Sequence, residues 1–167
     1  MNVISREEAI EISTKTLLKA EQERLMNINT FYPNEPLVRL LSDGREIRLE
    51  EDLSLATTEE IYTVPKGFIA NGSSFPRLLW TLTGGPLTGK HRLASIIHDW
   101  LCTERKVSWQ KAHKIYYLGC LIGGVDKLKA RSFYDALVVA GIKWNPDGTD
   151  IVTSNWDDEL DLELIGG

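Results

Sequence analysis

The stretch HRLASIIHDWLCTERKVSWQKAHKIYYLGC, residues 91–120, decides the fold of this chain. Apolar residues recur at helical spacing on both sides of a short polar connection, which predicts two helices packed as an antiparallel hairpin. The first helix has a broad apolar face made of Leu93, Ile96, Ile97, Trp100 and Leu101. The second, capped by Ser108, has a similar stripe made of Trp109, Ala112, His113, Tyr116, Tyr117 and Cys120. Such a hairpin can bring His98 of the first helix against His113 of the second.

Polar groups suited to chemistry gather around this hairpin. His98 and Asp99 are neighbours on the first helix, and adjacent helical residues point about 100° apart, so packing can hold one while the other reaches a cleft. A loop upstream, NGSSFPRLLW at residues 71–80, supplies further polar side chains. The candidate catalytic residues are His98 and Asp99, and the candidate binding or structural residues are Asn71, Ser74, Arg77, Trp80 and His113.

The segments VPKGFIANGSSFPRLLW, residues 64–80, and ASIIHDWLC, residues 94–102, resemble a family of tailed-phage and prophage proteins, domain-of-unknown-function family thirteen fifty-three. The family pattern runs P-x-G-F-x-T-D-x-x-S-x-P-R-x-x-W, then A-x-x-x-H-D-x-L-Y, then A-D-x-x-F on the next helix. The matching residues are Pro65, Gly67, Phe68, Ser74, Pro76, Arg77, Trp80, Ala94, His98, Asp99, Leu101 and Ala112. The resemblance implies a phage or prophage protein.

Three positions depart from the family pattern. Asn71 stands at the acidic position of the loop, His113 at the acidic position of the second helix, and Cys102 in place of the tyrosine. Two carboxylates are therefore missing. A family chemistry that used them to orient a base or bind a hard metal ion cannot run unchanged in this chain.

Two chemical hypotheses use the cluster. In the first, His98 is a general base whose tautomer is fixed by a polar neighbour, and Ser73, Ser74 or Arg77 contacts a substrate. In the second, zinc is bound by imidazole and thiolate groups, because these are its preferred ligands. The ligands would be His98, Cys102, His113 and a further cysteine, Cys120.

The third hypothesis is structural, and the loss of two acids favours it. Here His98 and Asp99 hydrogen-bond to the NGSSFPR loop, Arg77 pairs with Asp99, and Trp80 and Trp100 seal the contact. Buried polar groups need such partners whether or not a reaction occurs. Under this hypothesis no cofactor or metal is required.

Composition limits the classes of protein. With 167 residues, 43% of them hydrophobic, the chain has the size of one compact domain. A net charge of −5 argues against general nucleic-acid binding, and the basic run KLKAR, residues 127–131, is typical of a solvated helix face. The glycine-rich run TLTGGPLTGKHRL, residues 81–93, does not fit a Walker motif and indicates a flexible connector. No apolar run approaches the roughly 20 residues of a spanning helix, and no signal peptide is apparent.

The predicted architecture is α+β. Residues 1–30 form an N-terminal helix that begins at a Ser5–Glu8 capping box. We expect it to pack on its own core, with a neighbouring subunit as the alternative. Residues 31–143 form the family-like core, in which Asp43–Gly44 turns a β-hairpin of one small antiparallel sheet and about three helices follow. Residues 144–167 form an acidic tail, which we expect to dock through Trp156, Leu160, Leu162, Leu164 and Ile165.

The function expected from these features is that of a phage-encoded accessory or structural protein, part of the virion and associated with its tail or neck. Its partners would be other phage structural proteins or copies of itself, and it would pass from the host cytoplasm into the particle. The alternative is a small hydrolase that uses His98 and Asp99 on cell-envelope material. A hydrolase should present His98 in an open pocket, whereas an assembly protein should bury it.

Overall fold

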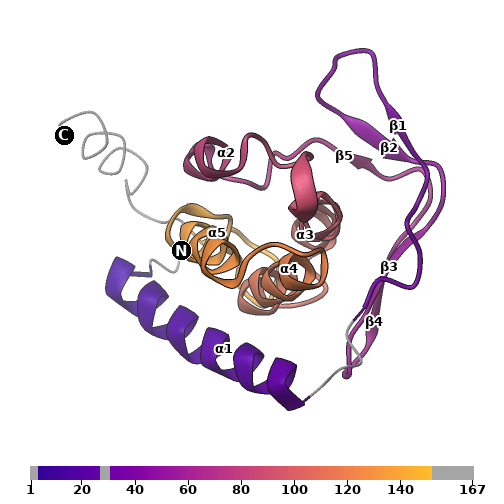
Figure 1. Ribbon diagram of the computed structural model, residues 1–167. Coiled ribbons are helices and arrows are strands. Elements are labelled where there is room, and N and C mark those ends of the chain that lie inside the picture. Colours follow the sequence, from indigo (N-terminus) through magenta and orange to yellow (C-terminus); the bar gives the residue numbers. More distant parts are fainter. Residues whose placement is uncertain (1–3, 27–30, 152–167) are drawn as a thin grey trace.

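The computed structural model describes residues 4–26 and 31–151. An N-terminal helix, α1, is followed by two small antiparallel sheets and then by the remaining helices, which confirms the predicted α+β class (Figure 1). The helices are α1 Arg6–Met26, α2 Arg77–Thr83, α3 Arg92–Glu104, α4 Trp109–Ile122 and α5 Lys127–Ala140, with a 3₁₀ helix, η1, at Gly89–His91. The strands are β1 Val38–Leu40, β2 Ile47–Leu49, β3 Leu53–Ala56, β4 Ile61–Val64 and β5 Ile69–Ala70.

The helical hairpin of α3 and α4 is the centre of the molecule, as residues 91–120 predicted. Arg105 ends α3 in a left-handed conformation with φ of 52°, and the Ser108 hydroxyl caps α4 by accepting a hydrogen bond from the backbone N–H of Lys111 at 3.2 Å. The two helices touch closely at Gly119, where an added Cβ would lie 2.9 Å from the Cβ of Ala94. A side chain at this position would therefore push the helices apart.

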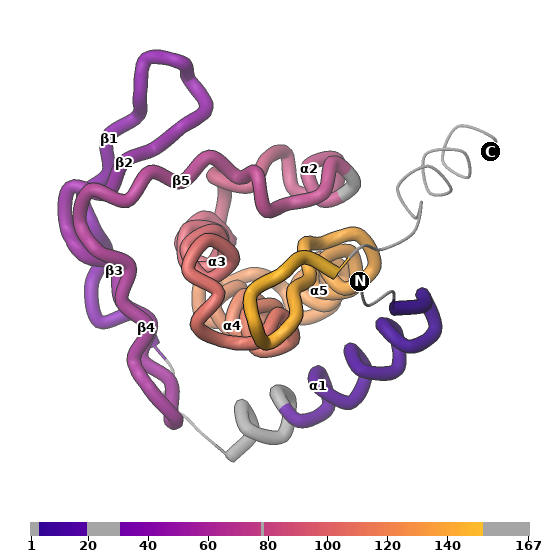
Figure 2. The backbone as a smooth tube through the Cα atoms, turned by 180° about the vertical axis from the view of Figure 1, so that it is seen from behind, coloured from indigo at the N-terminus to yellow at the C-terminus, as the bar shows by residue number. Residues whose placement is uncertain are grey.

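Helix α1 packs against α4 and α5 of its own chain, which confirms the expectation for the N-terminal helix. The Ser5–Glu8 capping box is formed, with the Ser5 hydroxyl accepting from the Glu8 N–H at 3.1 Å and the Glu8 carboxylate from the Ser5 N–H at 2.9 Å. Ala9 and Leu17 are buried against the helices, and the Tyr134 hydroxyl donates to the Ser13 carbonyl at 3.2 Å. Figure 2 shows α1 running along the outside of the helical part of the molecule.

The strands form two sheets, so the prediction of a single sheet was wrong. One sheet has the order β1-β2-β5 and the other contains β3 and β4, all antiparallel. The Asp43–Gly44 hairpin is confirmed: the Asp43 carboxylate accepts from the Arg45 and Glu46 N–H groups at 3.0 Å each. The split arises because the turn after Pro65 carries β5 back to β2, where Ile47 pairs with Ala70, instead of extending the β3–β4 pair.

The segment before α3 is helical earlier than predicted. We expected a loop through Trp80, but α2 begins at Arg77, because Pro76 fixes an extended conformation with φ of −65° just before it. The glycine-rich run is also more structured than a flexible connector. It contains η1, and His91 is buried with its ring 5.4 Å from that of Phe133.

The chain after α5 returns to the core. Lys143 and Trp144 are buried, and Trp144 forms an isolated bridge with Asp150. The boundary at residue 144 thus falls on a core residue. The predicted anchors between residues 156 and 165 lie outside the described residues. Among the helices of the described ranges, none has the length and apolar character needed to cross a bilayer.

Candidate functional site

The candidate residues come together in what we call the HD cluster: His98, Asp99 and Cys102 of α3, His113 of α4, and Ser74 of the loop before α2. Helical geometry explains the arrangement, since His98 and Cys102 are one turn apart and the hairpin turns α4 back along α3. All five residues are buried.

A row of hydrogen bonds crosses the cluster. The Oγ atom of Ser74 lies 3.4 Å from Nδ1 of His98, and Nε2 of His98 lies 2.9 Å from Nδ1 of His113. This confirms the prediction that the two histidines meet. The Sγ atom of Cys102 lies 3.7 Å from both ring nitrogens of His98, so it packs against that ring without facing one nitrogen alone.

Burial determines the charge of the two histidines. His98 and His113 are fully buried, and aromatic rings surround them, with Phe75 at 4.8 Å and Tyr116 at 5.4 Å from the His98 ring. Loss of solvation lowers the pKa of His98 to about 3. The pKa of His113 is also lowered well below its ordinary value, mainly by burial and further by His98 and the positive charge of Lys143. Both imidazoles are therefore neutral near neutral pH.

The neutral state of both rings and the surroundings of His113 indicate which ring nitrogens of the two histidines carry a hydrogen. One proton lies between the two rings, and Nε2 of His113 is buried without a hydrogen-bond partner. The positive charge of the buried Lys143, which acts on the His113 ring, favours a lone pair at this nitrogen over an N–H. His113 Nδ1–H then donates to His98 Nε2, and His98 Nδ1–H donates to the Ser74 hydroxyl oxygen. The cluster holds the loop through this relay.

Asp99 makes a second connection to the same loop. Its side chain is 4% exposed, and Oδ2 accepts a hydrogen bond from the backbone N–H of Asn71 at 3.0 Å. The Asn71 side chain does not reach Asp99; its Oδ1 accepts from the Ser73 N–H at 2.9 Å and shapes the turn. Asp99 and His98 thus fasten the two ends of the NGSS turn to α3.

Two parts of the predicted cluster were wrong. Arg77 is exposed and forms no ion pair with Asp99, because the acid is occupied by the loop backbone and Arg77 starts a surface helix. Trp80 is 40% exposed on the same helix, so it does not seal the contact. Phe75 takes that place, with its ring against His98.

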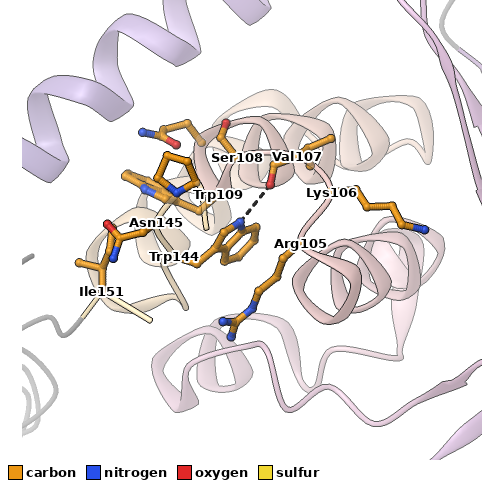
Figure 3. Close-up of a pocket in the computed structure, with 10 residues that line it drawn as sticks. Arg105, Lys106, Val107, Ser108, Trp109, Trp144, Asn145 and Ile151 are labelled. Atoms are coloured by element: carbon orange, nitrogen blue, oxygen red, sulfur yellow. Dashed lines mark hydrogen bonds between the residues drawn. The ribbon is translucent and has the colours of Figure 1, made fainter. Parts of the chain in front are cut away.

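Trp109 and Lys143 separate His113 from two pockets on its side of the molecule. A pocket of about 310 Å³ lies beside the α3–α4 connection (Figure 3). Its wall includes Trp109, whose ring centre is 5.5 Å from that of His113. A neighbouring pocket of similar size is lined by Lys143, whose Nζ lies 5.4 Å above the Trp109 ring. Neither of these two pockets has His98 or Asp99 in its lining.

Arg105 closes this side of the molecule. Its guanidinium donates to the Gly148 carbonyl at 2.6 Å, pairs with Asp150 at 2.7 Å and lies 5.5 Å from the Trp144 ring centre. Trp144 in turn donates its indole N–H to the Val107 carbonyl at 3.0 Å, as Figure 3 shows. Sequence reasoning missed Lys143, Trp144 and Arg105 in this role. The available signal was Trp144, a large apolar residue directly before the turn sequence Asn-Pro-Asp-Gly.

The zinc hypothesis finds no support in the donor geometry. A search of the described residues finds no group of three or more His, Cys, Asp or Glu side chains placed to hold a metal ion. His98 and His113 point nitrogen to nitrogen at hydrogen-bonding distance, and Cys120 contributes to a different part of the core.

The residues of the HD cluster lie within a sequence region that matches one protein family. The family's sequence profile, described as "Protein of unknown function (DUF1353)", matches residues 47–137. This chain belongs to DUF1353. The DUF1353 region runs from β2 into α5 and contains every residue of the HD cluster, while α1, β1, Lys143 and Trp144 lie outside it.

Two curated relatives are similar to this DUF1353 protein, and both are uncharacterized proteins of Sinorhizobium fredii (strain NBRC 101917 / NGR234). The protein y4jT is 34% identical over 83 residues, which is 50% of this chain and 25% of y4jT. The protein y4iH is 27% identical over 117 residues, which is 70% of this chain and 49% of y4iH. The chain thus spans at most about half the length of these relatives. No solved structure is significantly similar to it.

Proposed function

We propose that this protein is a non-enzymatic accessory or structural protein of a phage particle, associated with its tail or neck. One observation carries the non-enzymatic part: His98 and His113 are fully buried and Asp99 is 4% exposed. A general base must come within hydrogen-bond reach of its substrate. Trp109 packs on the His113 ring, and Trp109 and Lys143 line the two pockets on that side of the cluster.

In this proposal the HD cluster fastens a loop and has no substrate. The cluster joins α3, α4 and the NGSS turn through hydrogen bonds that are all internal. A buried polar group left without its partner costs about 1–3 kcal/mol. A row of such groups therefore requires the loop to stay in one position, which places α2 on the helical core.

The surface supports a role in assembly. Leu37 and Leu40, next to and within β1, are 64% and 66% exposed, and the β1–β2 loop projects away from the helices (Figure 1). Among the described strands, β1 pairs with β2 alone, so its outer edge is open. Open apolar strand edges readily pair with other chains. We propose that this hairpin contacts neighbouring subunits, which are other phage structural proteins or further copies of this chain.

The proposal that this is a phage protein is based on the family resemblance. It is tested by measuring whether the protein is present in purified phage particles. Particles of the encoding phage would be purified and the protein quantified by mass spectrometry against the major capsid protein. A fixed copy number compatible with the symmetry of a tail or neck would support the proposal. Absence from purified particles would overturn it.

The hydrolase alternative is tested separately with purified protein. Wild type and His98→Gln would be incubated with cell-envelope material, with Trp109→Ala as a variant that opens a path to His113. We expect no turnover by any of the three proteins. Turnover by wild type that His98→Gln lacks, with the variant still folded, would overturn the non-enzymatic proposal.

A further inference from the structure

The glycine-rich run at residues 81–93 and the basic run at residues 127–131 both contribute residues to one pocket. The glycine-rich run contributes Gly89, Lys90 and His91, and the basic run contributes Lys129 at the start of α5. The pocket measures about 630 Å³. It is completed by Thr83, Gly124, Val125, Asp126 and Phe133. Pockets for small molecules have volumes of about 300–1,000 Å³.

A close backbone contact brings the two runs together. A Cβ at Gly123 would collide with the carbonyl oxygen of Lys90, so the α4–α5 turn lies directly on η1. Gly124 follows with φ of 89°, a conformation that favours glycine, and its Cβ position is 3.7 Å from the Lys90 side chain. The turn therefore holds η1 and the start of α5 together around the pocket.

The charges that line the pocket are unbalanced. In the described part of the chain neither Lys90 nor Lys129 forms an ion pair, and the Lys129 ammonium lies 5.8 Å from the centre of the Phe133 ring, which lines the pocket. Asp126 is the single acid of the lining. Its Oδ1 already accepts from the backbone N–H groups of Leu128 and Lys129 at 3.0 and 3.3 Å. The lining thus leaves two ammonium groups available against one carboxylate that is used as a helix cap.

His91 adds a neutral acceptor. Its Nε2 lies 3.0 Å from the Gly85 carbonyl oxygen, which can only accept, so Nε2 carries the proton. Burial, and to a smaller degree Lys129, lowers the pKa of His91, which keeps the ring neutral. Nδ1 is then a lone pair, 3.6 Å from the Cβ position of Gly89, and both residues line the pocket. A lone pair suits a hydroxyl donor and repels a phosphate oxygen.

We propose that this pocket binds a phosphorylated, hydroxyl-bearing small molecule of the sugar phosphate or nucleotide class. Lys90 and Lys129 hold the phosphate group, Nδ1 of His91 accepts from a hydroxyl, and Val125 and Phe133 contact the carbon skeleton. The ammonium–phosphate contacts are charge-assisted hydrogen bonds, which are about twice as strong as neutral ones. The site is separate from the HD cluster and independent of the role in assembly.

The test is a titration of the full chain with ribose 5-phosphate, followed by amide and imidazole NMR signals at constant ionic strength. We expect saturable shifts confined to residues 83–91 and 123–133, including the His91 ring. Ribose alone and inorganic phosphate alone should bind more weakly than ribose 5-phosphate.

Lys90→Gln/Lys129→Gln should weaken ribose 5-phosphate binding by at least about tenfold, because two charged contacts are lost. The matched control is Lys19→Gln/Lys66→Gln, which removes the same charge at two exposed lysines outside the pocket and should keep the wild-type affinity. Equal weakening in both double variants, or shifts spread over lysines of the whole surface, would overturn the proposal. So would the absence of saturable shifts.

Discussion

Acid should destabilise this protein at a pH above the range in which most carboxylates titrate. The pKa of His98 falls from 6.5 to about 3 on folding, and that of His113 is lowered in the same direction. Below pH 6.5 the unfolded chain binds a proton at each of these histidines, whereas the folded chain does not. Stability is therefore full above about pH 7 and is lost as the pH falls toward the folded pKa.

The magnitude follows from linkage. For a group with an unfolded pKa of 6.5 that stays neutral in the folded state, a drop from about pH 7 to about pH 5 costs about 2 kcal/mol. His98 and His113 together lose about 4 kcal/mol, a large part of the stability of a domain of this size. His91, whose pKa is lowered less, adds a smaller loss of the same sign. Carboxylates with lowered pKa, such as Glu60, contribute only at lower pH.

The assay is urea unfolding, monitored by circular dichroism at several pH values between about pH 5 and about pH 7. The reference protein is the His91→Gln variant, in which His98 and His113 are the remaining histidines. His98→Gln on that background should reduce the pH dependence by about half. In the folded wild type, the imidazole C–H signals of both buried histidines should not titrate down to about pH 5. A free energy of unfolding that is constant across the window, or a titrating His98 signal, would refute the assignment of two buried neutral histidines.

Three further predictions concern stability and are measured by urea unfolding. Gly119→Ala should destabilise by about 1–3 kcal/mol, because the new Cβ meets Ala94, and an unchanged midpoint would contradict the close helix contact. Arg105→Ala should cost about 1–3 kcal/mol, because the contacts with Gly148 and Asp150 are lost. Arg105→Gly loses the same contacts but should cost less, because glycine tolerates the φ of 52° at this position. A larger loss for Arg105→Gly would contradict the argument from backbone strain. Asp99→Ala should cost about 1–3 kcal/mol and make the NGSS turn cleavable by protease, and full protease resistance would argue against the fastening role.

Local chemistry made much of this fold predictable. The Ser5–Glu8 box, the Ser108 cap and the Asp43–Gly44 turn each depend on residues within four positions of one another, and all three are formed. The contact of His98 with His113 was predictable because one short connection joins two strongly patterned helices. These features need no knowledge of distant contacts.

Features that depend on distant contacts were not predictable. The return of β5 to β2 splits the strands into two sheets, and nothing in the local pattern of Ile69 and Ala70 selects that partner. Asp99 binds the backbone of Asn71 in place of the side chain of Arg77, because α2 keeps Arg77 at the surface. The meeting of Lys90 with Lys129 likewise depends on the packing of a turn on η1.

The contacts of Arg105 with the chain after α5 fix the position at which the described part of the chain ends. Hydrogen bonds and an ion pair hold residues 148–150 beside the α3–α4 connection, so the following segment departs from a fixed point near the pocket of Figure 3. Loss of Arg105 would remove both contacts at once, so one side chain on the α3–α4 connection determines where a segment more than forty residues later in the chain is held.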